Sequence, residues 1–186
     1  MPQILPAFET ERLLLRPRRP EDLDAVMILN RDPEVMRFIA APGAATMSRE
    51  SVAARSFSHV AAGLGYWSVF PRDNVVEMLG YVGLIPEETE RGAAQISYRF
   101  GVRHWRNGYA SEAVPPLLRH GFGELGLPEI SLFTHPDNRA SCRLAARLGF
   151  TRAEAPASNR IGDPPVPGAL FRLTRNEWLS VTPPAA

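Results

Sequence analysis

Three runs of aromatic and β-branched residues in the middle of the chain constrain its fold most. They read YWSVF at 66–70, VVEMLGYVGL at 75–84 and AAQISYRFGV at 93–102, and turn-forming residues such as PRDN separate them. Short runs of this kind between turn signals are typical of consecutive antiparallel strands. We therefore expect a three-stranded meander over 66–102.

Segments with helical and strand-like patterns alternate on both sides of this meander. Upstream the sequence predicts a strand over 10–16, a helix opened by Pro20 and a helix over 48–62. Downstream it predicts, in order, a helix over 109–124, a strand over 129–135, a helix over 138–148 that ends at Gly149, and strands over 150–154 and 169–174. This order indicates one α/β or α+β domain with a mixed sheet. We place the domain at residues 1–180 and a short Pro/Ala tail at 181–186.

The helix expected over 109–124 carries two unusual features. Pro115 and Pro116 lie in its interior, where proline removes amide donors, so we expect a kink. Its end, GFGELG at 121–126, matches a dinucleotide-binding fingerprint letter for letter. That fingerprint requires a strand before it and a helix after it, whereas here the helix comes first. We interpret these glycines as the C-terminal turn of the helix rather than as the NAD site of an oxidoreductase.

The composition excludes several classes of function. All 21 cationic residues are arginine, so the chain has no lysine for a Schiff base or a phosphate-binding P-loop. A formal net charge of +1 argues against a dedicated nucleic-acid-binding protein. Cys142 is the single cysteine, and the apolar run near the start is too short for a signal peptide or a membrane span. We expect a cytoplasmic protein that binds neither nucleic acid nor a membrane.

The stretch RHWRNGYASEA at 103–113 lies between a predicted strand and a predicted helix. The backbone amides of 106–111 can then converge on one anion at the positive end of the helix dipole. Gly108 permits a positive φ or a close approach of the backbone to a ligand. An ordinary strand-to-helix turn is the alternative interpretation. We expect Trp105 to pack under the loop rather than to touch a ligand.

Three stretches together resemble the GNAT superfamily of N-acetyltransferases, in its RimJ/RimL-type branch. The stretch over 103–113 is similar to motif A of that branch, W-x-x-G-Y-A-x-E-A. TERLLLRPRRPEDLDAV and NRDPEVMRFI, over 10–39, resemble its N-terminal signature, and NRASCRLAARLGF over 138–150 resembles its second cofactor motif. The three stretches occur in the family's order and span almost the whole chain.

The resemblance implies a fold and a co-substrate. The fold is a mixed, mostly antiparallel central sheet with helices on both faces, whose fourth and fifth strands splay apart around acetyl-coenzyme A. The pantetheine arm would pair with backbone at Phe100 and Val102, and Asn138 would bind that arm or act only as an N-cap. The pyrophosphate would lie on the backbone amides of Arg106, Asn107, Gly108, Tyr109, Ala110 and Ser111. Arg103 and Arg106 would meet the ribose phosphate or solvent, and Glu112 would be a first-turn carboxylate or a substrate contact.

The catalytic groups follow the family pattern only in part. The backbone amide near Phe100 is the candidate donor to the oxyanion that forms during acyl transfer. Relatives use a tyrosine at the position of Ala145 here, so Ser141 is the nearest candidate acid, or else a hydroxyl that binds the cofactor. Relatives often carry glutamate at the position of Gln95. The other candidate bases are His104, His120, His135 and Glu154, and no pair of histidines has zinc-site spacing, so we predict no metal.

A weak base favours α-amines as acceptors. Deprotonating a lysine side chain at pH 7 costs about 4.6 kcal/mol, and an α-amine only about 1 to 1.4 kcal/mol. The sequence therefore predicts acetylation of a protein or peptide N-terminus by direct attack in a ternary complex. A small amine, such as a polyamine, an amino acid or an antibiotic, is the alternative acceptor, and a non-catalytic acyl-coenzyme A-binding module is the alternative function. We expect the loops at 40–46, 87–92 and 155–168 to control substrate access, and we leave a homodimer open.

Overall fold

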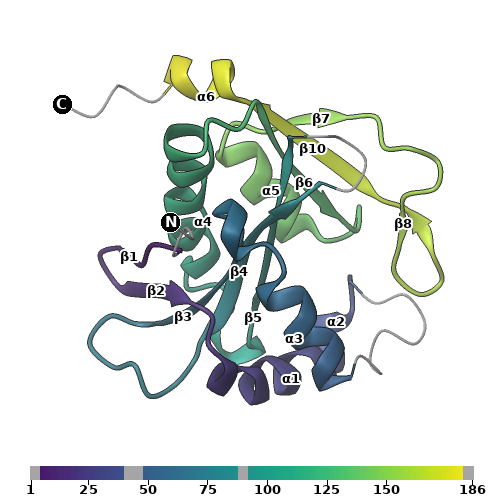
Figure 1. The fold of residues 1–186 in the computed structure, drawn as a ribbon. Helices are drawn as coiled ribbons and strands as arrows, with labels where there is room; N and C mark the ends of the chain where they lie inside the picture. Colours follow the sequence, from purple (N-terminus) through teal and green to yellow (C-terminus); the bar gives the residue numbers. More distant parts are fainter. Residues whose placement is uncertain (1–4, 40–47, 88–91, 182–186) are drawn as a thin grey trace.

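A mixed sheet of eight strands forms the centre of the protein, for which a computed structural model describes residues 5–39, 48–87 and 92–181 (Figure 1). The strand order is β1-β2-β3-β4-β5-β6-β10-β7, and only the β5–β6 pair is parallel. The strands are β1 (Phe8–Glu9), β2 (Leu13–Pro17), β3 (Gly65–Pro71), β4 (Gly80–Pro86), β5 (Ala94–Phe100), β6 (Glu129–Thr134), β7 (Thr151–Ala153) and β10 (Ala169–Thr174). A separate hairpin joins β8 (Arg160–Ile161) to β9 (Val166–Pro167). The predicted mixed, mostly antiparallel sheet is confirmed.

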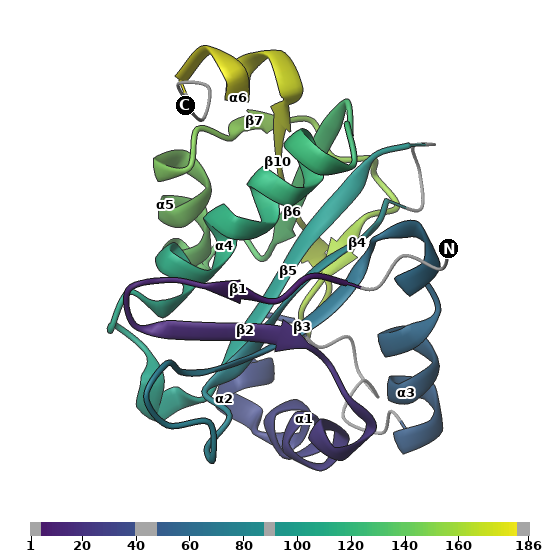
Figure 2. The same cartoon turned by 60° about the vertical axis from the view of Figure 1, so that its left-hand side comes forward.

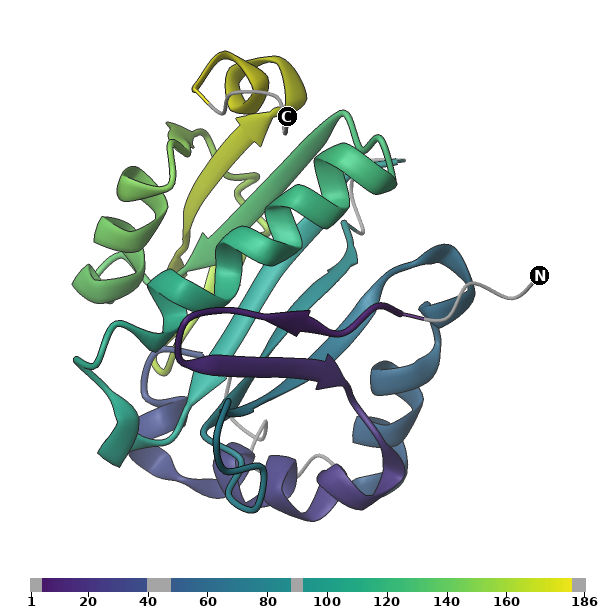
Figure 3. The same ribbon diagram turned by 90° about the vertical axis from the view of Figure 1, so that its left-hand side faces the viewer.

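Helices cover both faces of the sheet (Figures 2 and 3). They are α1 (Leu23–Arg31), α2 (Pro33–Met36), α3 (Arg49–Phe57), α4 (Tyr109–Arg119), α5 (Arg139–Arg147) and α6 (Arg175–Val181). Short 3-10 turns lie at Pro20–Asp22, Val60–Ala62 and Val102–His104. Helix α4 crosses one face with α5 beside it, and α1 and α3 lie on the other face (Figure 3). Within the described part of the chain, no helix is long and apolar enough to span a bilayer.

Successive side chains along the strands point to opposite faces of the sheet, and each face has its own hydrophobic core. On β4, Val82 and Leu84 are fully buried in the larger cluster, which also contains Leu117 and other residues of α4. Tyr66 and Tyr81 point the opposite way and pack with residues of α1 and α3. Because successive side chains in a strand face opposite sides, one meander supplies both cores.

The strands β5 and β6 pair over only part of their length. Their parallel register runs from Ala94↔Ile130 to Ile96↔Leu132 and then stops. Beyond that point β5 stays paired with β4 as far as Phe100, and β6 stays paired with β10 as far as Thr134. The sheet therefore parts between the carboxyl ends of β5 and β6. If the short β1 is not counted, these are the fourth and fifth strands, which the family resemblance predicts to splay apart.

Several element boundaries differ from the prediction. The run over 75–84 becomes a strand only from Gly80, because Val75 and Val76 are exposed and the Asn74 side chain turns the backbone by accepting the Val76 N–H. The run over 93–102 ends at Phe100. The strand expected over 10–16 begins only at Leu13 as β2, because residues 10–12 form the turn between β1 and β2. The helix expected over 48–62 ends as α3 at Phe57.

Helix α6 is absent from the predicted elements, and it includes Val181, the first residue of the predicted tail. It begins with a capping box in which Thr174 and Glu177 exchange hydrogen bonds: the Thr174 N–H and hydroxyl donate to Glu177 Oε2 and the Glu177 N–H donates to Thr174 Oγ1. The T-x-x-E spacing was a readable signal for this helix.

Helix α4 continues through Pro115 and Pro116 to Arg119 without a break (Figure 3). The irregular turn comes later, over His120–Glu124, where the Leu125 N–H reaches back five residues to the His120 carbonyl. The GFGELG stretch thus ends the helix, as predicted. A Cβ at Gly121 would lie 2.7 Å from Ile130 Cδ1, so this glycine serves close packing against β6.

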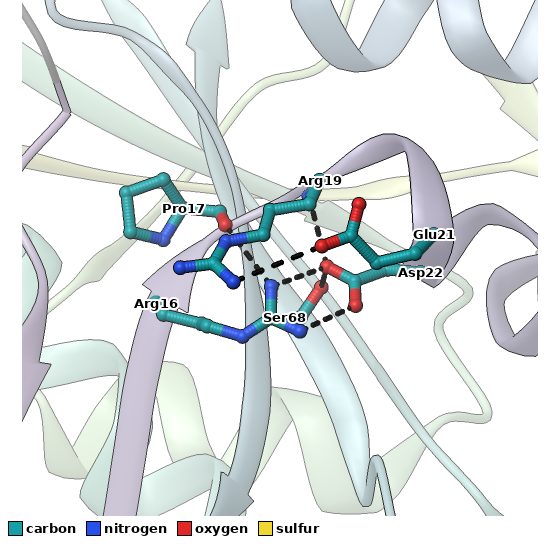
Figure 4. Close-up of polar contacts among 6 residues, drawn as sticks. All are labelled: Arg16, Pro17, Arg19, Glu21, Asp22 and Ser68. Carbon is teal, nitrogen blue, oxygen red and sulfur yellow. Dashed lines mark hydrogen bonds and ion pairs between the residues drawn. The ribbon is translucent and has the colours of Figure 1, made fainter. Parts of the chain in front are cut away.

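Asp22 joins the end of β2 to α1 and β3 (Figure 4). Both of its carboxylate oxygens accept from Arg16, at 2.7 and 2.8 Å, and Oδ2 also accepts from the Arg19 N–H and the Ser68 hydroxyl. Burial acts to raise the pKa of Asp22, but these hydrogen bonds outweigh it and hold the pKa below its ordinary value. The carboxylate is therefore ionised and fully engaged at neutral pH.

We expect Asp22→Asn to lower the free energy of unfolding by about 3 kcal/mol at pH 7, because it leaves a partly buried guanidinium unpaired. The contribution of Asp22 to the free energy of unfolding is complete above the pKa that Asp22 has in the unfolded chain. It is lost as the pH falls through the lower pKa of the folded state. The difference in unfolding free energy between variant and parent should therefore shrink below about pH 4. Urea unfolding at several pH values measures this. Asp24→Asn, which removes an exposed ion pair with Arg49, is the matched control and should cost under about 0.5 kcal/mol. Equal losses for both variants would contradict the assignment.

Candidate active site

A cavity of about 220 Å³ opens where β5 and β6 part. Side chains from both faces of the sheet line it. From the α1/α3 face come Arg18, Tyr66, Tyr81 and Arg99, and from the α4/α5 face come Tyr98, Leu132, Thr134, Asn138 and Ser141. A molecule bound on one face can therefore meet a molecule bound on the other.

Two backbone amides of β5 face the gap. The Gly101 N–H donates to the Leu79 carbonyl and the Glu87 N–H donates to the Ala93 carbonyl, so odd-numbered residues of β5 bond to β4. Since N–H groups alternate in direction along a strand, those of Tyr98 and Phe100 point toward β6. In the part of the chain that the structure describes, no strand pairs with β5 there, and these N–H groups can bind an extended ligand as an additional strand would.

The loop between β5 and α4 leaves its amides free. Among the described residues, no backbone carbonyl accepts from the N–H groups of 107–111, and the first helical hydrogen bond runs from the Glu112 N–H to the Gly108 carbonyl. Gly108 has a φ of 79° and Arg106 a φ of 62°, both in the left-handed region. The free amides at the positive end of α4 form the kind of site that binds phosphate.

Trp105 fixes this loop to the end of β5. Its indole N–H donates to the Phe100 carbonyl at 2.8 Å, and the Asn107 side chain donates to the Trp105 carbonyl. The carbonyl of Phe100 is thus occupied while its N–H faces the gap. Val102, predicted to pair with the pantetheine arm, lies beyond the strand in a 3-10 turn and is exposed.

The arginines near the loop differ in their partners. Arg103 forms an ion pair with Glu77, and Arg106 is exposed. Arg12, which the sequence analysis did not single out, lies 5.1 Å from the centre of the Tyr109 ring, and a Cβ at Gly108 would lie 3.5 Å from its Nη2. Arg12 is therefore a cation beside the free amides.

Glu112 holds the β1–β2 hairpin against α4. It accepts from the Thr10 hydroxyl and from the N–H and guanidinium of Arg12. Partial burial acts to raise the pKa of Glu112, but the hydrogen bonds from Thr10 and Arg12 outweigh it and lower the pKa. Its carboxylate is committed to these contacts rather than facing a substrate.

Helix α5 brings Asn138 and Ser141 to the cavity. Asn138 is the N-cap, since its side-chain oxygen accepts the Ser141 N–H at 3.2 Å, and its amide nitrogen is left for the cavity. Ala145 lies one turn after Ser141, buried on the same face. The side chain of Tyr98, which the sequence analysis also missed, lies beside Ser141 from the opposite wall.

The Tyr98 phenol has no hydrogen-bond partner of ordinary geometry among the described residues. Burial raises its pKa to about 12, and the neighbouring Ser141 hydroxyl opposes that rise. The phenol is therefore protonated at neutral pH and is free to donate to a ligand in the gap.

None of the four candidate bases lines the cavity. His104 contacts Glu77, and Glu154 is exposed. His120 is buried among aromatic rings with Nε2 at 2.9 Å from the Gly63 carbonyl, and His135 packs against Phe38. Gln95 does line the cavity, as a neutral side chain. The described residues contain no group of three or more potential metal ligands.

The loops proposed to control access are described only in part. The segment 40–46 lies outside the described residues, as do 88–91 of the loop at 87–92. The loop at 155–168 contains the β8–β9 hairpin, and Ile161 of β8 lines the cavity.

Comparison with known proteins assigns the family. The model of the acetyltransferase (GNAT) domain matches residues 12–151. The chain therefore belongs to the GNAT acetyltransferase family, and it is an acyltransferase.

Individual relatives agree with this assignment. The chain is 30% identical to the uncharacterized N-acetyltransferase YoaA of Bacillus subtilis, over 80% of this chain and 85% of that protein. It is also 30% identical to the FsC-acetyl coenzyme A-N(2)-transacetylase of Aspergillus fumigatus, over 97% of this chain and 81% of that protein. The structure of the ribosomal L7/L12 alpha-N-protein acetyltransferase RimL with coenzyme A superimposes with a TM-score of 0.75, covering 92% of this chain and 98% of that one at 18% identity. At this identity the last likeness shows a shared fold.

Proposed function

We propose that this protein is an acetyl-coenzyme A-dependent N-acetyltransferase that transfers an acetyl group to a primary amine by direct attack in a ternary complex. The observation that carries the proposal is the cavity that joins the two faces of the sheet where β5 and β6 part. Coenzyme A fits the α4/α5 side, because the free amides of 107–111 suit its pyrophosphate and those of Tyr98 and Phe100 suit its pantetheine arm. The amine enters from the α1/α3 side.

The site contains hydrogen-bond donors for the negative charge that develops first on the carbonyl oxygen and then on the sulfur. As the amine nitrogen bonds to the thioester carbon, the carbonyl oxygen becomes negative. One of the two free β5 amides, that of Phe100 or of Tyr98, is our candidate donor to it, and the other is left for the pantetheine arm. The C–S bond then breaks and the sulfur leaves as a thiolate, which takes up the proton that the amine nitrogen loses, so that the products are the amide and the free thiol of coenzyme A. A thiol like that of cysteine has a pKa near 8.5, so hydrogen bonds from Ser141 and Tyr98 stabilise the thiolate without a strong acid.

The acceptor amine has to arrive neutral or nearly so. The described cavity lining holds no carboxylate and no imidazole, and its arginines disfavour an ammonium ion. Both conditions favour an α-amine, of a protein or peptide N-terminus or of a small molecule. RimL, an alpha-N-protein acetyltransferase by name, supports the first, and the N(2)-transacetylase of Aspergillus fumigatus supports the second. The RimJ/RimL-type branch and the cytoplasm remain part of this proposal, supported by the three sequence stretches and the single cysteine.

Release of free thiol from acetyl-coenzyme A tests the proposal. The purified protein should release thiol in the presence of a panel of amines that includes peptide N-termini and small α-amines. A protein that binds coenzyme A in calorimetry but releases no thiol above background with any amine would instead be a binding module.

Gly108→Ala tests the phosphate-binding loop, with Gly126→Ala as the matched control. Both glycines have a positive φ, 79° and 64°, and neither leaves a new Cβ in a clash. Each variant should therefore lose about 1 kcal/mol of stability. Only Gly108→Ala should weaken coenzyme A binding, by about tenfold, since it alone disturbs amides that hold phosphate. Equal coenzyme A affinity for the two variants in calorimetry would contradict this location.

Tyr98→Phe and Ser141→Ala test the proposed donors to the leaving thiolate. Tyr98→Phe should lower kcat by about tenfold to a hundredfold and leave coenzyme A affinity unchanged, because the lost hydrogen bond forms only as the thiolate develops. Ser141→Ala should also lower kcat. If either variant changes KM and coenzyme A affinity but not kcat, its hydroxyl binds the cofactor instead.

A further inference from the structure

The α1/α3 side of the cavity contains a buried arginine, Arg18, that forms no ion pair with any residue the structure describes. Arg18 is 7% exposed, and its Nη1 donates to the Ser56 hydroxyl at 2.9 Å. Its Nε and Nη2 have no hydrogen-bond partner among the described residues. Burial of such donors is costly unless something pairs with them, so they call for a ligand.

The surroundings of Arg18 hold it in place without neutralising it. The guanidinium carbon lies 4.5 Å from the centre of the Tyr66 ring and 4.4 Å from that of the Tyr81 ring. The two rings clamp the planar group by cation–π contact, which fixes its orientation and leaves its charge in the cavity.

The carboxylate that acts on Arg18 electrostatically, Asp22, is already engaged. Its oxygens accept from Arg16, Arg19 and Ser68. The described lining of the cavity contains no aspartate or glutamate. The positive charge on this side is therefore not balanced by the lining.

A second guanidinium adds to this charge. Arg99 also lines the cavity, 5.8 Å from the Tyr81 ring centre, and its hydrogen bond goes to the neutral Asn30 side chain. Arginines that converge on one cavity are the usual means of binding a carboxylate or a phosphate.

We propose that Arg18 and Arg99 form an anion subsite for the acceptor, so that the substrate is a primary amine that carries a carboxylate or similar acid group a few bonds from its nitrogen. This inference rests on the proposed function. The acid group pairs with Arg18, which directs the amine toward the gap between β5 and β6. The same charges oppose a polyamine, which has no group to pair with them. A free amino acid and a peptide with an acidic first residue both present this chemistry.

Matched pairs of amines test the subsite. L-Methionine, L-phenylalanine and L-glutamine are each compared with their carboxamides in the thiol-release assay, and spermidine serves as a polycation. The carboxamides have the less basic amines, so a site without anion recognition would prefer them. We expect each amino acid to exceed its carboxamide in kcat/KM by at least about tenfold, the size of one charge-assisted hydrogen bond. Equal or reversed preference, or efficient use of spermidine, would overturn the proposal.

A pair of peptides, tested in the same assay, distinguishes the two sources of the acid group. Amidated Asp-Ala is compared with amidated Asn-Ala, which differs only in the side-chain charge. Preference for the aspartyl peptide over its partner and over the free amino acids assigns the subsite to peptide N-termini, and preference for free amino acids assigns it to small molecules.

Arg18→Met tests the residue, with Arg49→Met as the control, because Arg49 is a half-exposed arginine that pairs with Asp24. Arg18→Met should abolish the preference for the acid form and leave coenzyme A affinity unchanged, since coenzyme A binds the other face. Its Tm should stay the same or rise, because an unpaired buried charge is removed. A lower Tm with the preference retained would show a structural role and overturn the proposal.

Product binding separates this proposal from the proposed function. Calorimetry of the protein with coenzyme A measures N-acetyl-L-methionine against N-acetyl-L-methioninamide and requires no turnover. Tighter binding of the acid, lost in Arg18→Met, supports the subsite even if no amine of the panel is acetylated. Equal binding overturns the subsite and leaves the proposed acetyl transfer standing wherever thiol release is observed.

Discussion

The parting of β5 and β6 after Ile96 and Leu132 is the constraint on which the site depends. It has a simple origin, because each strand remains paired along its other edge, β5 with β4 and β6 with β10. Two twisted half-sheets that share only three residue pairs diverge beyond them. The divergence leaves backbone amides of β5 without a partner strand and opens a passage between the faces. The two substrates of an acyl transfer can meet there while each binds to its own face.

Two arginines at the end of β2 and just after it have different roles, one in stability and the other in the cavity. Arg16 and Arg18 are separated by one residue. Among the residues that the structure describes, Arg16 pairs with both oxygens of Asp22, whereas Arg18 has no ion-pair partner. Arg18 is held by Tyr66 and Tyr81, whose rings fix its position without cancelling its charge. A buried and unpaired guanidinium weakens the fold. Its place on the cavity wall is explained if the acceptor supplies the missing anion.

Local signals predicted much of the fold and part of the site. The N-cap at Asn138, the helix end at Gly149 and the strand-to-helix loop around Gly108 all depend on residues near in sequence, and each lies where it was expected. The prediction was wrong at 75–79, where β-branched residues lie in an exposed turn, because propensity does not report burial. Arg12 and Tyr98 were missed for a related reason: their neighbours Gly108 and Ser141 are distant in the chain.

The amino-acid sequence by itself determined the order of the main strands and helices, the class of the fold and the resemblance that named its family. Turn residues, caps and hydrophobic periodicity act over a few positions, and they can be read without a structure. Only the tertiary structure decided which side chains face the cavity, which arginines have counter-ions and which amides lack a partner. These properties arise when segments far apart in the chain are packed together, since charge pairing and desolvation depend on distance in space.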